Sequence, residues 1–166
     1  MVDTSKLSEQ DIWKELSTIT DPEIPVITIE DLGILREVKK DGEKVTVTIT
    51  PTYSGCPAMS TIGIEIRIKL KDLGFDEIEI KNQLSPAWNT DWLSEEGRKK
   101  LEDYGIAPPQ ATGHVLSLFG EEPAIKCPNC KSEDTRLVSQ FGSTSCKALY
   151  QCNDCLEPFD YFKCHR

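Results

Sequence analysis

The stretch ILREVKKDGEKVTVTITPTYSGCPAMSTIGIEIRIKLKDLGFDEIEIKN, residues 34–82, decides the fold of the first part of this chain. It begins with two runs that alternate apolar and polar residues, joined by Asp41 and Gly42, a pair that favours the positive φ of tight hairpin turns. It ends with FDEIEIKN, residues 75–82, whose alternation predicts a third strand. We therefore expect a hairpin and a third strand, with one further element between them.

That further element, residues 56–74, fits two patterns. Apolar residues alternate as they do in a strand, at Ile62, Ile64, Ile66, Ile68 and Leu70. A helical stripe is present as well, formed by Met59, Ile62, Gly63, Ile66, Leu70 and Leu73. Pro57 suits the first turn of a helix and Gly74 suits its C-terminal end, so these flanking residues favour the helix.

Two more helices are expected outside this stretch. Ser8 followed by Asp11 forms a capping pattern, and apolar residues then recur at helical spacing, so a helix is predicted from about residue 9 to 19. In TDWLSEEGRKKLEDYG, Ser94 is suited to cap a helix and Gly105 to end it.

The chain changes character after these helices. Residues 106–123 are rich in proline, glycine and small residues, which is typical of a linker or an extended arm. Beyond it, short β-prone runs lie between cysteine turns. We expect two domains, at residues 1–120 and 121–166, the second a small β module.

Two cysteine pairs in the second domain have the spacing of a structural metal site: Cys127 and Cys130 in CPNC, and Cys152 and Cys155 in CNDC. A segment of about 40 residues cannot bury enough apolar surface to fold alone, whereas metal binding can supply the missing free energy. We predict a closed four-cysteine site for Zn²⁺. Iron in the same tetrahedron, as in rubredoxins, is the alternative, because the geometry admits both metals.

Cys56 stands apart from these pairs, directly before Pro57. If a helix begins there, Cys56 occupies its N-cap, where unpaired N–H groups and the helix dipole favour an anion. We therefore expect its thiol to ionise more easily than an ordinary one, and so to attack or to bind a soft metal. Burial for packing is the alternative, since free cysteines are often buried.

The remaining cysteines and the histidines have weaker interpretations. Cys146 is expected to be a small buried hydrophobe rather than a ligand, although it is an additional candidate for the metal site. Cys164 and His165 are either a frayed terminus or a second metal-binding pair. His114 is interpreted as a surface residue.

Charge and composition exclude several classes of protein. The formal net charge of −9 disfavours binding to phosphate backbones, so no nucleic-acid partner is expected. No apolar run is long enough for a membrane span, and the N-terminus does not resemble a secretion signal. We expect a cytoplasmic protein whose cysteines are reduced thiols or metal ligands.

Longer strings resemble a known family. DPEIPVITIEDLGILREV, TPTYSGCPAM and the following helix resemble the SufT-type domain of iron–sulfur cluster assembly proteins, over residues 7–82. With SPAWNTDWLSEEGRKKLEDYGIAPP, FGSTSCKALYQC and PFDYFKC added, the whole chain resembles the PaaD/PaaJ-type family, which belongs to the phenylacetyl-CoA epoxidase system of aerobic phenylacetate degradation.

The resemblance implies an α+β fold, with helices on a small mixed sheet, followed by a zinc ribbon. It maps the family's motif cysteine to Cys56 and its acidic motif to Asp21 and Glu23, which from the sequence alone are either oxygen ligands or caps. It implies an accessory role in iron–sulfur or iron centre maturation, with transient iron or cluster binding. Independent catalysis is not expected, because the sequence shows no Ser/His/Asp set, phosphate-binding glycine loop or open His-rich metal site. The other epoxidase subunits, especially the iron–sulfur reductase, and general iron–sulfur assembly proteins are the implied partners. The alternative is a structural or electron-transfer component with iron in the ribbon.

Overall fold

The computed structural model describes residues 4–109 and 124–163, and the chain forms two compact units, Met1–Trp88 and Asn89–Arg166. This division differs from the expected one at 120/121, because the helix capped by Ser94 and the strand after it belong to the second unit. Each unit is described by itself.

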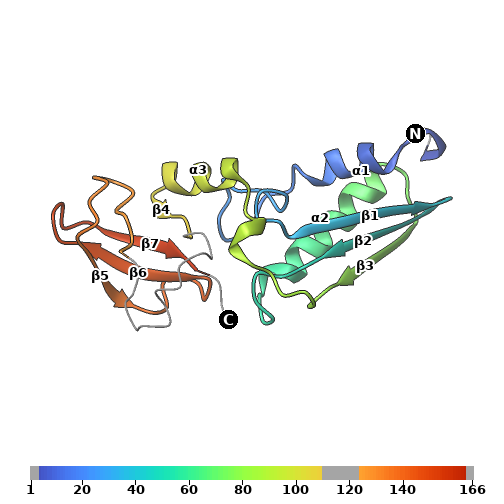
Figure 1. Cartoon of the computed structure of the whole chain (residues 1–166). Coiled ribbons are helices and arrows are strands. Elements are labelled where there is room, and N and C mark those ends of the chain that lie inside the picture. Colours follow the sequence, from blue (N-terminus) through green and yellow to red (C-terminus); the bar gives the residue numbers. More distant parts are fainter. Residues whose placement is uncertain (1–3, 110–123, 164–166) are drawn as a thin grey trace. The chain divides into compact units, whose positions relative to one another are not determined.

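The described part of the first unit contains three strands and two α-helices, whose arrangement is drawn in Figure 1. In chain order its elements are η1 (Thr4–Lys6), α1 (Glu9–Leu16), β1 (Leu35–Asp41), β2 (Lys44–Ile49), α2 (Ala58–Asp72) and β3 (Glu77–Asn82). The sheet order is β1-β2-β3; β1 and β2 form the expected antiparallel hairpin, and β3 runs parallel to β2. Helix α2 is the crossover that two neighbouring parallel strands require.

The sheet has one apolar and one polar face. On β2, Val45, Val47 and Ile49 are buried beneath the helices, and α1 and α2 lie against each other in that layer. The opposite face carries charged pairs such as Lys44 and Glu79, whose Nζ and Oε2 atoms are 2.8 Å apart. This two-layer arrangement confirms the predicted α+β class.

The ambiguous segment is a helix. Ile62, Ile66 and Leu70 are completely buried, at the i, i+4, i+8 spacing of one helical face. The intervening Ile64 and Ile68 are exposed, which is the opposite of what a strand with all five residues on one face would need. Helix α1 also forms as predicted, with a reciprocal capping box between Ser8 and Asp11, although it ends at Leu16 rather than near residue 19.

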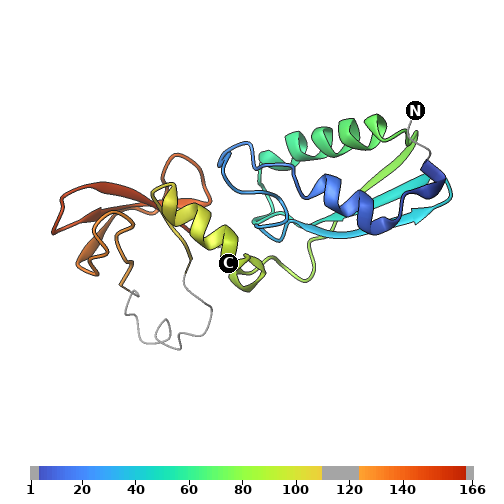
Figure 2. The ribbon, with the colours of Figure 1, turned by 90° about the horizontal axis from the view of Figure 1, so that it is seen from above.

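The described part of the second unit has two short helices followed by the strands of a four-stranded sheet (Figure 2). Its elements are η2 (Thr90–Trp92), α3 (Glu95–Asp103), β4 (Ile106–Ala107), β5 (Thr135–Ser139), β6 (Lys147–Cys152) and β7 (Pro158–Phe162). The sheet order is β4-β7-β6-β5. Strand β4 begins the segment predicted to be a linker and pairs with β7 instead; residues 110–123 of that segment lie outside the described residues.

The core of this unit is small and includes one buried ion pair. Phe159 and Phe162 on β7 are buried, as is Ala148 on β6. Lys147 Nζ lies 3.4 Å from Asp160 Oδ2, with the lysine side chain 8% exposed and the aspartate side chain 25% exposed. In the described part of the chain, no helix has the length and apolar character that crossing a membrane would require.

Candidate metal centre and thiol site

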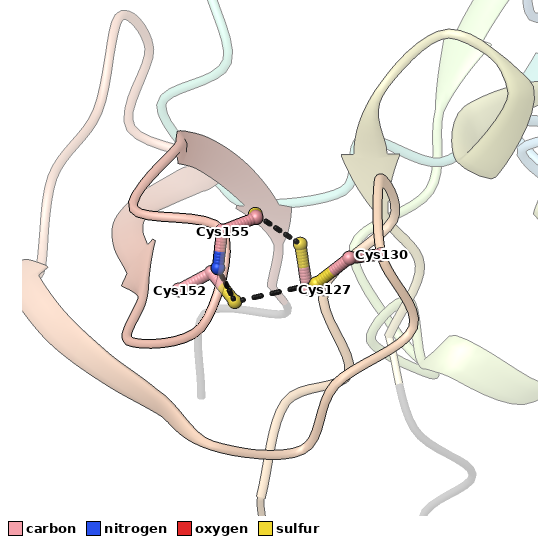
Figure 3. A group of neighbouring side chains, drawn as sticks. All are labelled: Cys127, Cys130, Cys152 and Cys155. Atoms are coloured by element: carbon pink, nitrogen blue, oxygen red, sulfur yellow. Dashed lines mark hydrogen bonds between the residues drawn. The ribbon is translucent and has the colours of Figure 1, made fainter.

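The structure brings the four paired cysteines together at one end of the second unit's sheet. Cys127 and Cys130 lie on the turn before β5, whereas Cys152 ends β6 and Cys155 lies on the turn between β6 and β7 (Figure 3). All four sulfur atoms lie within 4.8 Å of one another. Two of the separations are 3.8 Å and 3.5 Å, between Cys127 and Cys155 and between Cys130 and Cys152.

These separations fit a tetrahedral metal ion. With metal–sulfur bonds of about 2.3 Å, the sulfur atoms of a Zn²⁺ tetrahedron are about 3.8 Å apart. The group can therefore bind a metal without rearrangement of the two turns, and every vertex of the tetrahedron is a protein thiolate. A closed site of this kind stabilises a fold and leaves no open position for substrate.

The two cysteine turns share one backbone geometry. The Cys127 N–H donates to the Ser132 carbonyl, and the Cys152 N–H donates to the Glu157 carbonyl at the same offset. The residue after each pair, Lys131 or Leu156, has a φ of 67° or 64°. Both residues are in the left-handed region that non-glycine residues rarely adopt, so each turn holds backbone strain that metal binding offsets.

Backbone N–H groups favour the thiolate at two of these cysteines, with opposite net effects on their pKa values. The Cys155 N–H, 3.5 Å from Cys152 Sγ, is the main cause that lowers the pKa of Cys152 to about 7. At Cys155 the Glu157 N–H acts in the same direction, but lost solvation and the neighbouring sulfur atoms outweigh it and raise the pKa to about 12. The thiols therefore do not all ionise together near neutral pH, and metal binding must displace protons.

The second site is at the start of α2. The structure places Pro57 at the N-cap, so Cys56 lies one residue earlier than expected. The backbone N–H groups of Ala58 and Met59, at the start of the helix, act to lower the pKa of its half-buried thiol. The predicted contact between thiol and helix N-terminus is therefore present.

The predicted consequence of that contact is wrong. The pKa of Cys56 is raised above its ordinary value, first because burial disfavours the thiolate, and then because the charges of Asp21 and Glu23 repel it. These effects outweigh the N–H groups of Ala58 and Met59. Cys56 is therefore a thiol that keeps its proton, rather than a preformed thiolate.

The repulsion between the two carboxylates and the Cys56 thiolate also shows that the acidic motif lies near Cys56. Asp21 and Glu23 come from the loop after α1, and the fold brings both within electrostatic reach of Cys56. Asp21 is buried, and its Oδ1 accepts hydrogen bonds from the N–H groups of Glu23 (2.8 Å) and Ile24 (2.9 Å). It thus acts as a cap while its charge is felt at the thiol. Asp31 is a loop cap, in a reciprocal pair of hydrogen bonds with Thr28.

Cys146 is not part of the metal group in the described structure. It is buried directly before β6, with its Sγ 3.0 Å from Thr144 Oγ1, as expected for a packed thiol. Cys164, His165 and His114 lie outside the described residues.

One local feature of these sites was missed by sequence reasoning. It is the strained backbone of Lys131 and Leu156, which only their position after each cysteine pair could have indicated.

Comparisons with known proteins agree with this two-part organisation. Residues 9–80 match the family model of an iron-sulfur cluster assembly protein, and residues 111–163 match that of the PaaD zinc beta ribbon domain. In solved structures, a domain of unknown function, DUF59, from Bacillus anthracis has a TM-score of 0.52 and 26% identity, over 56% of this chain and 90% of that chain.

Two curated proteins are similar in sequence. A putative 1,2-phenylacetyl-CoA epoxidase subunit of Escherichia coli (strain K12) is 50% identical over 154 residues, which are 93% of this chain and 92% of that protein. An Fe-S protein maturation auxiliary factor of Porphyromonas gingivalis is 38% identical over 96 residues, which are 57% of this chain and 90% of that protein. With an assembly-type domain, a PaaD ribbon and half of its residues in common with the first of these, the chain belongs to the PaaD-type family of phenylacetyl-CoA epoxidase subunits.

Proposed function

We propose that this chain is an accessory protein of aerobic phenylacetate degradation that assists the maturation of iron–sulfur or iron centres in the phenylacetyl-CoA epoxidase complex. The proposal is supported by a relative named as a subunit of that epoxidase and by a second named as an Fe-S protein maturation factor. The observation that carries it is the grouping of Cys56 with the charges of Asp21 and Glu23 at the start of α2.

In this proposal, iron or a cluster is cargo that binds Cys56 for a limited time. Before cargo arrives, burial and the two carboxylates keep the Cys56 proton in place. A ferrous ion reverses the balance, because its positive charge is attracted by both carboxylates and stabilises the thiolate. The Sγ–iron bond then forms as the thiol proton passes to solvent, and the reverse exchange at the client releases the ion. A thiol that regains its proton readily is suited to transfer rather than storage.

The test replaces Cys56 with serine and measures iron and labile sulfide in the co-expressed iron–sulfur reductase of the epoxidase. The expected result is lower cluster occupancy with Cys56→Ser and unchanged occupancy with Ser54→Ala, an exposed neighbour used as the matched control. Full occupancy with Cys56→Ser would remove Cys56 from the pathway. The other implied partners are the remaining epoxidase subunits and general iron–sulfur assembly proteins in the cytoplasm.

We propose further that the ribbon's metal is structural zinc, held by Cys127, Cys130, Cys152 and Cys155. The proposal is supported by the closed four-thiolate geometry and by the zinc ribbon family model. A rubredoxin-like iron site for electron transfer would use the same tetrahedron. Elemental analysis and visible absorption separate the two: one zinc per chain and no colour are expected, whereas a stoichiometric, coloured iron centre would establish the alternative.

A further inference from the structure

Helix α2 exposes two large apolar side chains on the side away from its core. Ile64 is 59% exposed and Ile68 is 54% exposed, and they lie one helical turn apart. Figure 2 shows α1 beside α2 on one side, while the opposite side has no other helix or strand of the described part of this unit. Ile64, Arg67, Ile68 and Lys71 together are called the α2 row here.

Folding of the unit does not require these isoleucines. β-Branched residues are poorer helix formers than lysine, glutamate or glutamine, and an exposed apolar side chain gains nothing from burial. Exposed isoleucines on a helix, which are unfavourable for both reasons, are expected where another surface covers them. Leu84 is the other large apolar side chain exposed to this degree among the described residues of the unit, and it lies beyond β3 rather than on the helix.

The α2 row borders a groove of about 240 Å³ between the helix and β3. Its lining includes Ile64, Arg67, Gly63 and Ile80, together with Met59 at the start of the helix. A Cβ on Gly63 would lie 3.9 Å from Ile80 Cδ1, so glycine at this position leaves space over β3. The Met59 N–H donates to the Cys56 carbonyl at 3.3 Å, so one end of the groove lies next to the thiol site.

The form of the groove favours a helix over an added strand. Strand β3 is at the edge of its sheet, but Arg67 Nη1 already donates to the Ile78 carbonyl on it, at 3.0 Å. A charged side chain placed against an edge strand discourages pairing with another chain. An apolar pair at i and i+4 beside a groove is instead the arrangement that receives an amphipathic helix.

Charge selects the kind of helix. Arg67 and Lys71 are the charged members of the row, in a chain whose net charge is −9. Glu65 and Asp72 each follow a row member by one position, so the helical turn directs them to a neighbouring face. The Lys71 ion pair with Asp76 spans 3.7 Å between side chains that are 62% and 96% exposed, so Lys71 remains accessible. A second copy of the chain would bring like charges together, which makes it a poor occupant.

We propose that the α2 row is the docking site for an acidic amphipathic helix of the client protein, which is thereby held with its metal site near Cys56. This rests on the proposed function for its direction of transfer, but the docking itself does not depend on Cys56. Apolar residues of the client helix cover Ile64 and Ile68, and its carboxylates face Arg67 and Lys71.

The experiment measures the affinity of the full chain for each purified epoxidase subunit, the reductase included, by biolayer interferometry. The double substitution of Ile64→Glu with Ile68→Glu, and Arg67→Glu alone, are each expected to weaken binding roughly tenfold or more, because they place carboxylates where the client presents its own. Leu84→Glu, an equally exposed apolar position outside the row, is the matched control and should bind as the unaltered chain does. Thermal melts of the isoleucine and Leu84 variants should agree with that of the unaltered chain, because the altered side chains are exposed. Arg67→Glu also loses the hydrogen bond to the Ile78 carbonyl, so it should melt slightly earlier while remaining folded at the assay temperature.

The outcomes separate docking from transfer. If Cys56→Ser binds normally but fails to load the client, both proposals stand. If Cys56→Ser loads normally while the row variants lose binding, the docking site stands and the transfer role falls. The docking proposal is overturned if the row variants bind every subunit as well as Leu84→Glu does, if no subunit binds the unaltered chain, or if the variants abolish self-association in sedimentation instead.

Discussion

The turn that holds Cys152 and Cys155 allows a quantitative test of how backbone strain and metal binding are balanced. Leu156 has a φ of 64° and its side chain is 67% exposed, so a leucine here has the strain of the left-handed region and few contacts to lose. The left-handed conformation costs an L-residue about 1–2 kcal/mol, and a glycine loses about 0.5–1 kcal/mol more backbone entropy on folding. Leu156→Gly should therefore stabilise the folded, metal-bound unit by about 0.5–1 kcal/mol.

The Gln151 Nε2 hydrogen bond to the Leu156 carbonyl survives the change, because it is made to the backbone. Lys131→Gly is the matched comparison, with a φ of 67° at the equivalent place. It removes the contacts of Lys131 Nζ with Glu102 Oε1 and the Pro128 carbonyl, which offset part of the gain. We expect little or no net stabilisation from Lys131→Gly.

Denaturant unfolding of the metal-loaded chain, followed by tryptophan fluorescence and by metal release to a chromophoric chelator, measures both effects. Leu156→Gly should also raise metal affinity by about the same free energy, a few-fold in the dissociation constant, because the metal-free turn no longer has to be forced into its binding conformation. A Leu156→Gly chain that unfolds more easily than the unaltered chain, with its metal content intact, would show that the positive φ is not a source of strain.

Three further perturbations have expected outcomes of their own. Lys147→Met removes the lysine of the ion pair with Asp160, so the free energy of unfolding should fall by about 2–3 kcal/mol. The loss is somewhat smaller than for a fully buried pair, because the aspartate side chain is 25% exposed. Denaturant titration measures it. Asp21→Asn keeps a side-chain oxygen for the turn but removes a negative charge near Cys56, so the pKa of Cys56 should fall. Iodoacetamide should then alkylate the thiol faster at neutral pH. An unchanged or slower alkylation rate would contradict the effect assigned to the Asp21 charge. Lowering the pH should weaken metal binding by the cysteine group. The fall in metal affinity per pH unit should become steeper below the pKa of about 7 at Cys152, because Cys152 then becomes protonated as well. Competition with a chelator of known proton affinity measures it.

The parts of the fold that local pattern controls were predictable. The hairpin at Asp41 and Gly42, the capping box at Ser8 and the spacing of the four paired cysteines each depend on neighbours a few residues away, and all have the expected local structure. The segment with alternating isoleucines could be assigned to a helix from the residues on either side, because Pro57 favours the start of a helix and Gly74 its end, whichever face is buried.

Features that depend on long-range contacts were not predictable in the same way. Strand β4 has only two residues, and its pairing with β7 joins positions far apart in the chain, so nothing in its own sequence distinguishes it from a linker. The direction of the Cys56 pKa shift also depends on residues far away in the sequence. The helix N-terminus beside the thiol is a local feature, whereas the burial and the carboxylates that outweigh it come from the folded loop that contains Asp21 and Glu23.

The two cysteine sites differ in where their negative charge is balanced, and this difference separates retention from transfer. At the ribbon, a backbone N–H group faces one sulfur and the four sulfur atoms lie within 4.8 Å of one another, so an ion held by all four would leave only if the turns opened. At Cys56, the N–H groups at the helix start favour the thiolate, but burial and two carboxylates shift the balance toward the protonated thiol. Under the proposed function, such a site would bind a cation only while the cation's charge compensated the carboxylates, and it would recover its proton when a better set of ligands was offered. A client seated on the α2 row would bring those ligands to the same end of the helix.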